Sequence, residues 1–120
     1  MAIKVWDYLR EYENEKEELH AAIEKVLKSG TLILGENVKR FEREFANYCG
    51  VNFGVGVNSG TDALFLGLKA LGIGTGDEVI TVANTAVPTV SAIVSTGATP
   101  RFVDIDPDTY LMNTALLQKA

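Results

Sequence analysis

The stretch GVGVNSGTDALFLGL, residues Gly54–Leu68, decides the fold. Small and β-branched side chains alternate in its first part, which predicts a strand over Phe53–Val57. A leucine-rich pattern with helical spacing follows and predicts a helix over 62–71. Four small residues, NSGT at 58–61, join the two patterns. The sequence therefore predicts a strand, a tight turn and a helix in immediate succession.

The turn at 58–61 has two interpretations, and the residues alone leave both open. In the first, Ser59 or Thr61 caps the helix and Asp62 complements its dipole, as short polar residues commonly do. In the second, the unpaired N–H groups of the helix N-terminus hold an anion such as phosphate. Gly60 would then allow close approach, and the hydroxyls of Ser59 and Thr61 would add donors. Ligands gather at such strand ends in parallel α/β sheets.

Strands and helices continue to alternate after this turn. The pattern predicts strands over Glu78–Val82 and Arg101–Ile105. Between them it predicts a helix over Pro88–Ser95, with proline in the first turn and Thr85 as a cap. Alternation of this kind implies parallel pairing with helical crossovers. We therefore expect an α/β fold with a mostly parallel sheet and flanking helices.

Two amphipathic helices are predicted before the turn, and one helix after the last strand. Apolar spacing predicts a helix over 15–28 and another over Val38–Tyr48, which Gly50 closes. The last stretch, NTALLQKA, predicts a helix that begins at Asn113 and has no stop signal. That ending is typical of a truncated chain. The segment GTLILGEN, residues 30–37, is an apolar loop, which is either a buried connection or a surface that packs on a partner subunit or lines a site.

Composition limits the class of protein. The chain has 120 residues, the size of one small domain, and 47% of them are hydrophobic. A formal charge of −5 argues against nucleic acid or an anionic membrane as partner. The single cysteine fits a reducing compartment, and we find neither a signal peptide nor a membrane-spanning run. We expect a cytoplasmic location.

Several other candidates are weaker than the turn. Residues 54–59 begin like a dinucleotide-binding fingerprint, but Ser59 stands where the third glycine belongs, so we reject it. We expect His20 on the surface and Cys49 in buried packing. The spaced carboxylates in VDIDPDTY, residues 103–110, fit an Asx-type turn better than a cation site. None of the seven lysines lies in an apolar context that would lower its pKa for covalent work.

Three long stretches together resemble the DegT/DnrJ/EryC1/StrS family of sugar aminotransferases. They are AIEKVLKSGTLILGENVKRFEREFANYCGV (22–51), GVGVNSGTDALFLGLKALGIGTGDEVI (54–80) and STGATPRFVDIDPDTYLMN (95–113). The ordered series SG…LG…FE…FA…Y.GV…NSGTDAL…GDEVI…GA.P.FVDID is specific. The resemblance covers nearly the whole chain from about Ile3 onward.

The resemblance implies a cofactor, a reaction and an assembly. In that family the turn at 58–61 grips the phosphate of pyridoxal 5′-phosphate (PLP), so Gly60 and Thr61 carry over as phosphate contacts, with Ser59 beside them. The fold implied is the large domain of a fold type I, aspartate-aminotransferase-like PLP enzyme. The family moves an amino group, commonly from glutamate, to a keto group of a nucleotide-linked deoxysugar. A homodimer is implied as well.

The chain departs from the family in two ways. Ala86 occupies the position where many members carry an aromatic that stacks on the cofactor ring. The Schiff-base lysine and the aspartate that pairs with the pyridine nitrogen lie beyond residue 120 in the family. The resemblance thus implies that residues 1–120 are the N-terminal part of the PLP-binding large domain and are inactive alone. A non-catalytic or split-protein interaction module and an unrelated phosphate-binding α/β domain remain as alternatives.

The family's strand order also carries an expectation for folding. Phe53–Val57 should not pair directly with Glu78–Val82, because a later part of the chain supplies the strand between them. Unpaired edges and exposed apolar side chains would follow for these residues alone. We therefore expect that the 120 residues do not form a stable monomer of native architecture.

Overall fold

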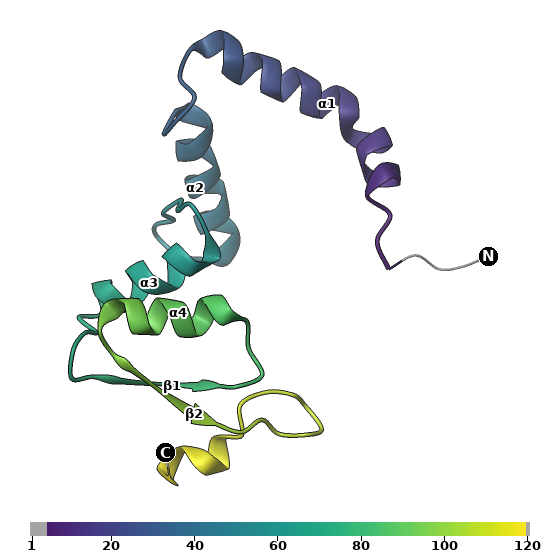
Figure 1. Cartoon of the computed structure of the whole chain (residues 1–120). Helices are drawn as coiled ribbons and strands as arrows, with labels where there is room; N and C mark the ends of the chain where they lie inside the picture. Colours follow the sequence, from purple (N-terminus) through teal and green to yellow (C-terminus); the bar gives the residue numbers. More distant parts are fainter. Residues whose placement is uncertain (1–4, 120) are drawn as a thin grey trace. The chain divides into compact units, whose positions relative to one another are not determined.

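The computed structural model describes residues 5–119, and the chain divides into two compact units, residues 1–56 and 57–120. Figure 1 shows the elements in chain order. The first unit holds two helices, and the second holds an α/β layer. The bounds are α1 (Tyr8–Ser29), α2 (Glu36–Cys49), α3 (Gly60–Ala70), β1 (Glu78–Val82), α4 (Val87–Thr96), β2 (Thr99–Val103) and the 3₁₀ helix η1 (Thr114–Lys119).

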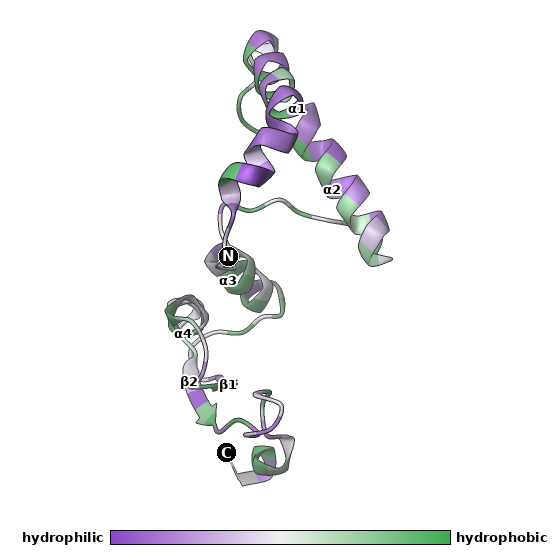
Figure 2. Ribbon diagram, turned by 90° about the vertical axis from the view of Figure 1, so that its right-hand side faces the viewer, coloured by the Kyte–Doolittle hydropathy of each residue, from purple (hydrophilic) through white to green (hydrophobic). Residues whose placement is uncertain are grey.

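Helix α1 is longer than predicted and has no buried residue. It begins at Tyr8, whereas apolar spacing predicted a start at residue 15. The extra turns contain Leu, Arg and Glu, which favour helix without giving an apolar stripe. Figure 2 colours most of α1 as hydrophilic. Gly30 ends the helix in the left-handed region, with φ of 69°, as the stop signal predicted.

Helix α2 carries an aromatic face. The rings of Phe41 and Phe45 stack with centroids 5.5 Å apart, and the ring of Tyr48 lies 6.4 Å from that of Phe45. Gly50 ends α2 with φ of 69°, as predicted. The side chains of the loop between α1 and α2 are exposed, by 65% at Leu32, so a buried connection is wrong within this unit.

Residues 53–57 do not form an assigned strand, but the expectation that they would not pair directly with Glu78–Val82 is confirmed. These residues pair with no strand in the part of the chain that the structure describes, and the sheet consists of β1 and β2. Phe53 and Val55 are exposed by 86% and 80%, whereas the two glycines beside them lie against α2. The alternation that suggested a strand is therefore real, but no ladder forms.

The second unit is a parallel β–α–β layer with α3 beside it. β1 and β2 pair in parallel, with Glu78 opposite Thr99 and Val82 opposite Val103. β1 has the predicted bounds, and β2 begins two residues before its predicted start. Helix α4 contacts both β2 and α3. The α/β fold class with a parallel sheet and flanking helices is thus confirmed.

The core of the second unit lies between α4 and the sheet. Ala92, Ile93 and Val103 are buried there. Buried Thr96 donates its hydroxyl to the carbonyl of Ile93 at 2.7 Å, which satisfies its polar group. Side chains from α3, α4 and β1 also enclose a small pocket of about 120 Å³. Figure 1 shows α3 and α4 running side by side, with their N-terminal ends toward the side where β1 ends.

An ordered turn follows β2. Ile105 forms an isolated antiparallel bridge with Met112, and the backbone N–H of Asn113 donates to Asp104. Asn113 Oδ1 then accepts from the backbone N–H of Ala115 at 3.1 Å. The predicted C-terminal helix is therefore present from Thr114 as a 3₁₀ helix, with Asn113 as its cap.

Candidate functional site

The hydroxyl of Ser59 caps helix α3 and also bonds to the side chain of Asp62. Its Oγ accepts from the backbone N–H of Asp62 at 3.1 Å and donates to Asp62 Oδ2 at 3.0 Å. The backbone of Ser59 is extended, with φ of −157° and ψ of 164°, as capping residues normally are. Ser59, and not Thr61, is therefore the cap, and Asp62 complements the dipole in the first turn as predicted.

Two backbone donors at this helix start stay unused. The N–H of Asp62 binds the Ser59 hydroxyl, and the N–H of Ala63 binds the Ser59 carbonyl at 3.0 Å. Among the described residues, the N–H groups of Gly60 and Thr61 have no hydrogen-bond partner, and neither does the Thr61 hydroxyl. A Cβ at Gly60 would meet no atom within 4 Å, so the approach is open.

These donors suit a phosphate group. Two adjacent N–H groups at the positive end of a helix dipole, with one hydroxyl beside them, are the chemistry that binds phosphate oxygens. The residues present at 60 and 61 thus fit the phosphate of PLP. The hydroxyl of Ser59 is different, because its one proton is donated to Asp62.

Ala86 lies at the start of the next helix. It precedes α4 without a side-chain cap, and its carbonyl accepts from the N–H of Thr89 at 3.0 Å. The cap predicted at Thr85 is wrong, because Thr85 Oγ1 lies 2.9 Å from Thr89 Oγ1 instead. Ala86 and the side chain of Phe102 both line a pocket of about 620 Å³ beside α4. No hydrogen bond joins Ala86 to Ser59–Thr61 in the described residues.

The acidic stretch after β2 is a turn, as predicted. Asp106 Oδ1 accepts from the backbone N–H groups of Asp108 and Thr109 at 3.0 and 2.9 Å. It also accepts from the Thr109 hydroxyl at 3.1 Å. These hydrogen bonds, led by the one from the Thr109 backbone, lower the pKa of the Asp106 carboxyl. No cluster of possible metal ligands occurs among residues 5–119.

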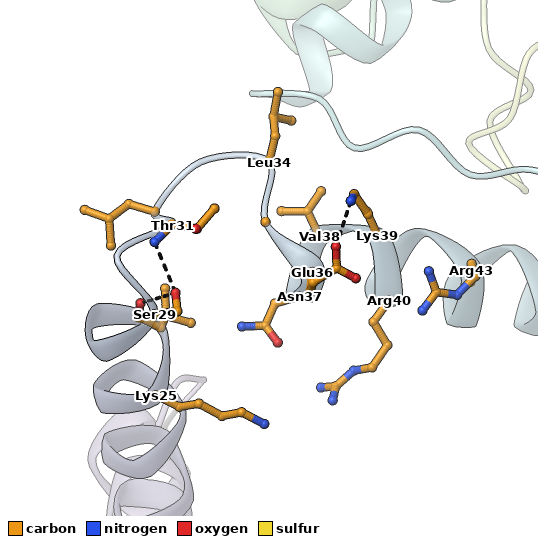
Figure 3. Close-up of a pocket in the computed structure, with 13 residues that line it drawn as sticks. Lys25, Ser29, Thr31, Leu34, Glu36, Asn37, Val38, Lys39, Arg40 and Arg43 are labelled. Carbon is orange, nitrogen blue, oxygen red and sulfur yellow. Dashed lines mark hydrogen bonds and ion pairs between the residues drawn. The ribbon is translucent and has the colours of Figure 1, made fainter.

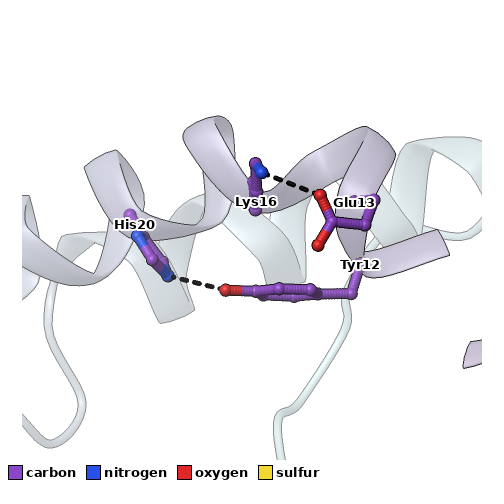
Figure 4. Close-up of polar contacts among 4 residues, drawn as sticks. All are labelled: Tyr12, Glu13, Lys16 and His20. Atoms are coloured by element: carbon purple, nitrogen blue, oxygen red, sulfur yellow. Dashed lines mark hydrogen bonds and ion pairs between the residues drawn. The ribbon is translucent and has the colours of Figure 1, made fainter. Parts of the chain in front are cut away.

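The histidine and the cysteine both lie on helices of the first unit. His20 is exposed, as predicted, and its Nε2 lies 3.4 Å from Tyr12 Oη on α1 (Figure 4). Lys16 pairs with Glu13 at 2.7 Å beside it. Cys49 is exposed, so the expectation of buried packing is wrong. It sits at the end of α2, where the described residues do not cover it. None of the lysines with described surroundings is buried.

A pocket of about 650 Å³ lies between the end of α1 and the start of α2. Figure 3 shows the side chains of Lys25, Arg40 and Arg43 at its edge. Lys39 pairs with Glu36 at 2.7 Å, which lowers the pKa of the Glu36 carboxyl. Arg40 lies 3.5 Å from Glu44, and its side chain is 62% exposed. These charges form a solvated helix surface.

No helix among the described residues is both long and apolar enough to cross a membrane.

Known proteins resemble this chain over its whole length. A transaminase from Micromonospora megalomicea subsp. nigra, named for dTDP-3-amino-3,4,6-trideoxy-α-D-glucose, is 50% identical over 120 residues. That match covers 100% of this chain and 32% of the relative. The chain therefore spans about a third of the length of the curated relative.

Two solved structures share the fold. The crystal structure of DesV from S. venezuelae in complex with a ketimine intermediate matches with a TM-score of 0.90 and 45% identity, over 94% of this chain and 30% of that one. NtdA from Bacillus subtilis, with bound cofactor PMP, matches with a TM-score of 0.86 and 34% identity, over 89% of this chain and 25% of that one.

The family model that matches is the DegT/DnrJ/EryC1/StrS aminotransferase family, over residues 13–120. It contains both the turn at 58–61 and the β–α–β layer. The relatives and the solved structures agree with this match in sequence and in fold. The chain belongs to the DegT/DnrJ/EryC1/StrS aminotransferase family.

Proposed function

We propose that the protein containing this chain is a PLP-dependent sugar aminotransferase. It moves an amino group, from glutamate, to a keto group of a nucleotide-linked deoxysugar. Family membership and the name of the Micromonospora relative support this proposal. Residues 1–120 form the N-terminal part of the PLP-binding large domain, and the protein acts as a cytoplasmic homodimer. Bound PLP supplies an electron sink for the reaction.

One observation carries the assignment of the cofactor site. The N–H groups of Gly60 and Thr61 and the Thr61 hydroxyl are free of partners at an open helix start. We assign these three donors to the phosphate of PLP. Ser59 holds the first turn in place by capping α3, which keeps the donors aligned. Ala86 lies beside the cofactor ring, where its methyl group gives a smaller contact than an aromatic ring would.

The chain's own residues bind and orient in this proposal. The helix dipole and the donors at 60 and 61 neutralise phosphate charge, so binding energy is spent far from the reacting atoms. In the family the lysine that holds the cofactor lies beyond residue 120, and we propose that this protein follows the family there. An in-frame coding sequence beyond codon 120 with an apolar-flanked lysine would support this.

The experiment compares Thr61→Ala with Thr61→Ser in the complete protein. The lost hydroxyl bond to a charged acceptor is worth about 1.5–3 kcal/mol. Thr61→Ala should therefore weaken PLP binding roughly tenfold or more in a spectroscopic titration. Thr61→Ser keeps the hydroxyl and should bind PLP nearly as well as the original protein. Unchanged affinity in Thr61→Ala would overturn the phosphate assignment.

Of the two alternative functions, one is excluded and one remains to be tested. An unrelated phosphate-binding domain is wrong, because the chain belongs to the aminotransferase family. An interaction module that keeps the phosphate-gripping turn without catalysis is the second candidate. Transamination by the complete protein, followed with glutamate and a nucleotide-linked keto sugar, separates this candidate from the enzyme.

A further inference from the structure

We infer that Glu42 is a positioning residue for the phosphate-binding turn. It fixes the segment of chain that leads into Ser59, Gly60 and Thr61. The inference rests on the proposed function, since it concerns the same phosphate donors. Glu42 itself does not touch the cofactor in this proposal.

The first observation is a hydrogen bond across fourteen residues of sequence. The backbone N–H of Gly56 donates to Glu42 Oε1 at 2.7 Å. A bond of this length to a carboxylate is charge-assisted and stronger than one between neutral groups. Glu42 is half-buried on α2, and it takes part in no ion pair among the described residues. Its carboxylate is therefore available to hold the backbone at Gly56.

The second observation is the close fit of two glycines against the same residue. A Cβ at Gly54 would lie 2.7 Å from the carbonyl oxygen of Glu42, which is backbone and cannot move aside easily. A Cβ at Gly56 would lie 3.3 Å from Glu42 Oε1 and 3.5 Å from Val38 Cγ1. The glycines of GVG thus serve close packing on α2, which agrees with the rejection of a dinucleotide-binding fingerprint.

The hydrogen bond between Gly56 and Glu42 lies close in sequence to the phosphate-binding turn. Ser59, the cap of α3, comes three residues after Gly56. Glycine-rich backbone loses more conformational freedom on ordering than other backbone does, so a free segment 54–56 would leave the following turn poorly placed. Hydrogen-bond donors work only when they are held close to the productive geometry. Glu42 supplies that restraint at Gly56, two residues before the turn at 58–61 begins.

Sequence reasoning assigned no role to Glu42. Glu42 is one of three glutamates in α2, and the other two, Glu36 and Glu44, pair with nearby basic residues. The available signal was the spacing of Val38 and Glu42 by four, which places both on one face of α2. Only the structure shows that Gly56 lies on that face.

The experiment uses the complete protein and two probes, PLP and pyridoxal, which lacks the phosphate. Glu42→Ala should weaken PLP binding roughly fivefold to tenfold and change pyridoxal binding less than about twofold. Glu42→Gln keeps a side-chain oxygen that accepts from Gly56, so it should restore most of the PLP affinity. Glu44→Ala removes a carboxylate from the same helix without touching residues 54–56, and it should leave both affinities unchanged.

A second variant tests the same contact in case Glu42→Ala does not fold. Gly56→Ala places a Cβ 3.3 Å from Glu42 Oε1, at the end of a side chain that can shift by a few tenths of an ångström, so it should weaken PLP binding less than Glu42→Ala does while again sparing pyridoxal binding. The double variant Thr61→Ala with Glu42→Ala should lose less than the product of the two single losses, because both act through one set of donors.

The outcomes separate this inference from the proposed function. Equal losses for PLP and pyridoxal, or unchanged PLP affinity in Glu42→Ala, would overturn the role of Glu42. If Thr61→Ala weakens PLP binding while Glu42→Ala does not, the phosphate site stands and the positioning role is wrong. If neither variant weakens binding, the phosphate assignment falls and takes the positioning role with it.

Discussion

Gly97 is required by both its backbone conformation and its neighbour. It ends α4 with φ of 92°, and a Cβ there would lie 2.6 Å from Thr75 Oγ1 and 3.2 Å from the Thr75 backbone nitrogen. Gly72 also has a positive φ, of 81°, but a Cβ there would meet no atom within 4 Å. The two positions separate the effect of the backbone from the effect of crowding.

We therefore predict that asparagine is tolerated at one of these positions only. Asparagine adopts the left-handed region at small cost, so Gly72→Asn should lower the free energy of unfolding by less than about 1 kcal/mol. Gly97→Asn should cost at least about 1 kcal/mol more, measured by urea unfolding of the complete protein. Thr75→Ala should recover part of the loss in Gly97→Asn. Equal costs at both positions would contradict the crowding at Gly97.

The Asp106 carboxyl gives a prediction about pH. Its folded-state pKa lies below the ordinary value of 3.8, mainly because the Thr109 backbone donates to it. Because the pKa is lowered on folding, the ionised carboxylate stabilises the folded turn at pH values above the unfolded-state pKa. This stabilisation is lost as the pH falls through the folded-state pKa. An NMR titration of the carboxyl should show the lowered pKa. Thr109→Val removes the hydroxyl donor, so the pKa should move back toward 3.8 but not reach it.

At the scale of elements, α3 depends on its cap. Ser59→Ala removes the acceptor for the Asp62 N–H and should lower the free energy of unfolding by about 1 kcal/mol. Ser59→Asn keeps a capping oxygen and should lose much less, because asparagine caps helices as well as serine does. Thermal unfolding of the complete protein measures both. A full loss in Ser59→Asn would show that the bond to Asp62 Oδ2, and not the cap, is what matters.

Local patterns predicted most elements, and the errors have physical causes. Five helical segments and both observed strands were found from apolar spacing, prolines and glycine stops, because these signals lie within one element. The start of α1 at Tyr8 was missed because its first turns have no apolar stripe. Residues 53–57 are not assigned as a strand, since alternation reports only a local conformation and a strand also needs a partner, which the family's strand order places in a later part of the chain.

The candidate site also has features that the sequence predicts and features that it does not. The turn at 58–61 was predictable, because a cap and a phosphate-binding helix start use the same residue types at the same place. Which of the two hydroxyls, Ser59 or Thr61, caps the helix was not predictable. The choice depends on backbone angles that the sequence does not specify. Contacts between segments, such as Glu42 with Gly56, were also out of reach, since they join residues far apart in the chain.

At the scale of the whole molecule, the described residues bury little apolar surface. The buried hydrophobic residues are Ala46, Ala92, Ile93, Ala98 and Val103, and no large side chain is fully buried among those described. Large apolar side chains are exposed instead, among them Ile33 by 81% and Val87 by 78%. Exposed apolar area of this kind marks surfaces that other protein covers.

We therefore predict that the 120-residue chain alone associates with itself. Sedimentation velocity should show a size that grows with concentration, and a hydrophobic dye should bind the chain far more than it binds the complete protein. The variant Ile33→Glu places a charge in the exposed loop between α1 and α2, and it should reduce association because it makes an exposed apolar surface polar. As a control, Lys28→Gln removes a charge from α1, where the Lys28 side chain is 73% exposed. This variant should not reduce association. A monomer at every concentration, with one cooperative melt, would contradict the prediction and show that these residues reach a stable fold without covering their apolar surface.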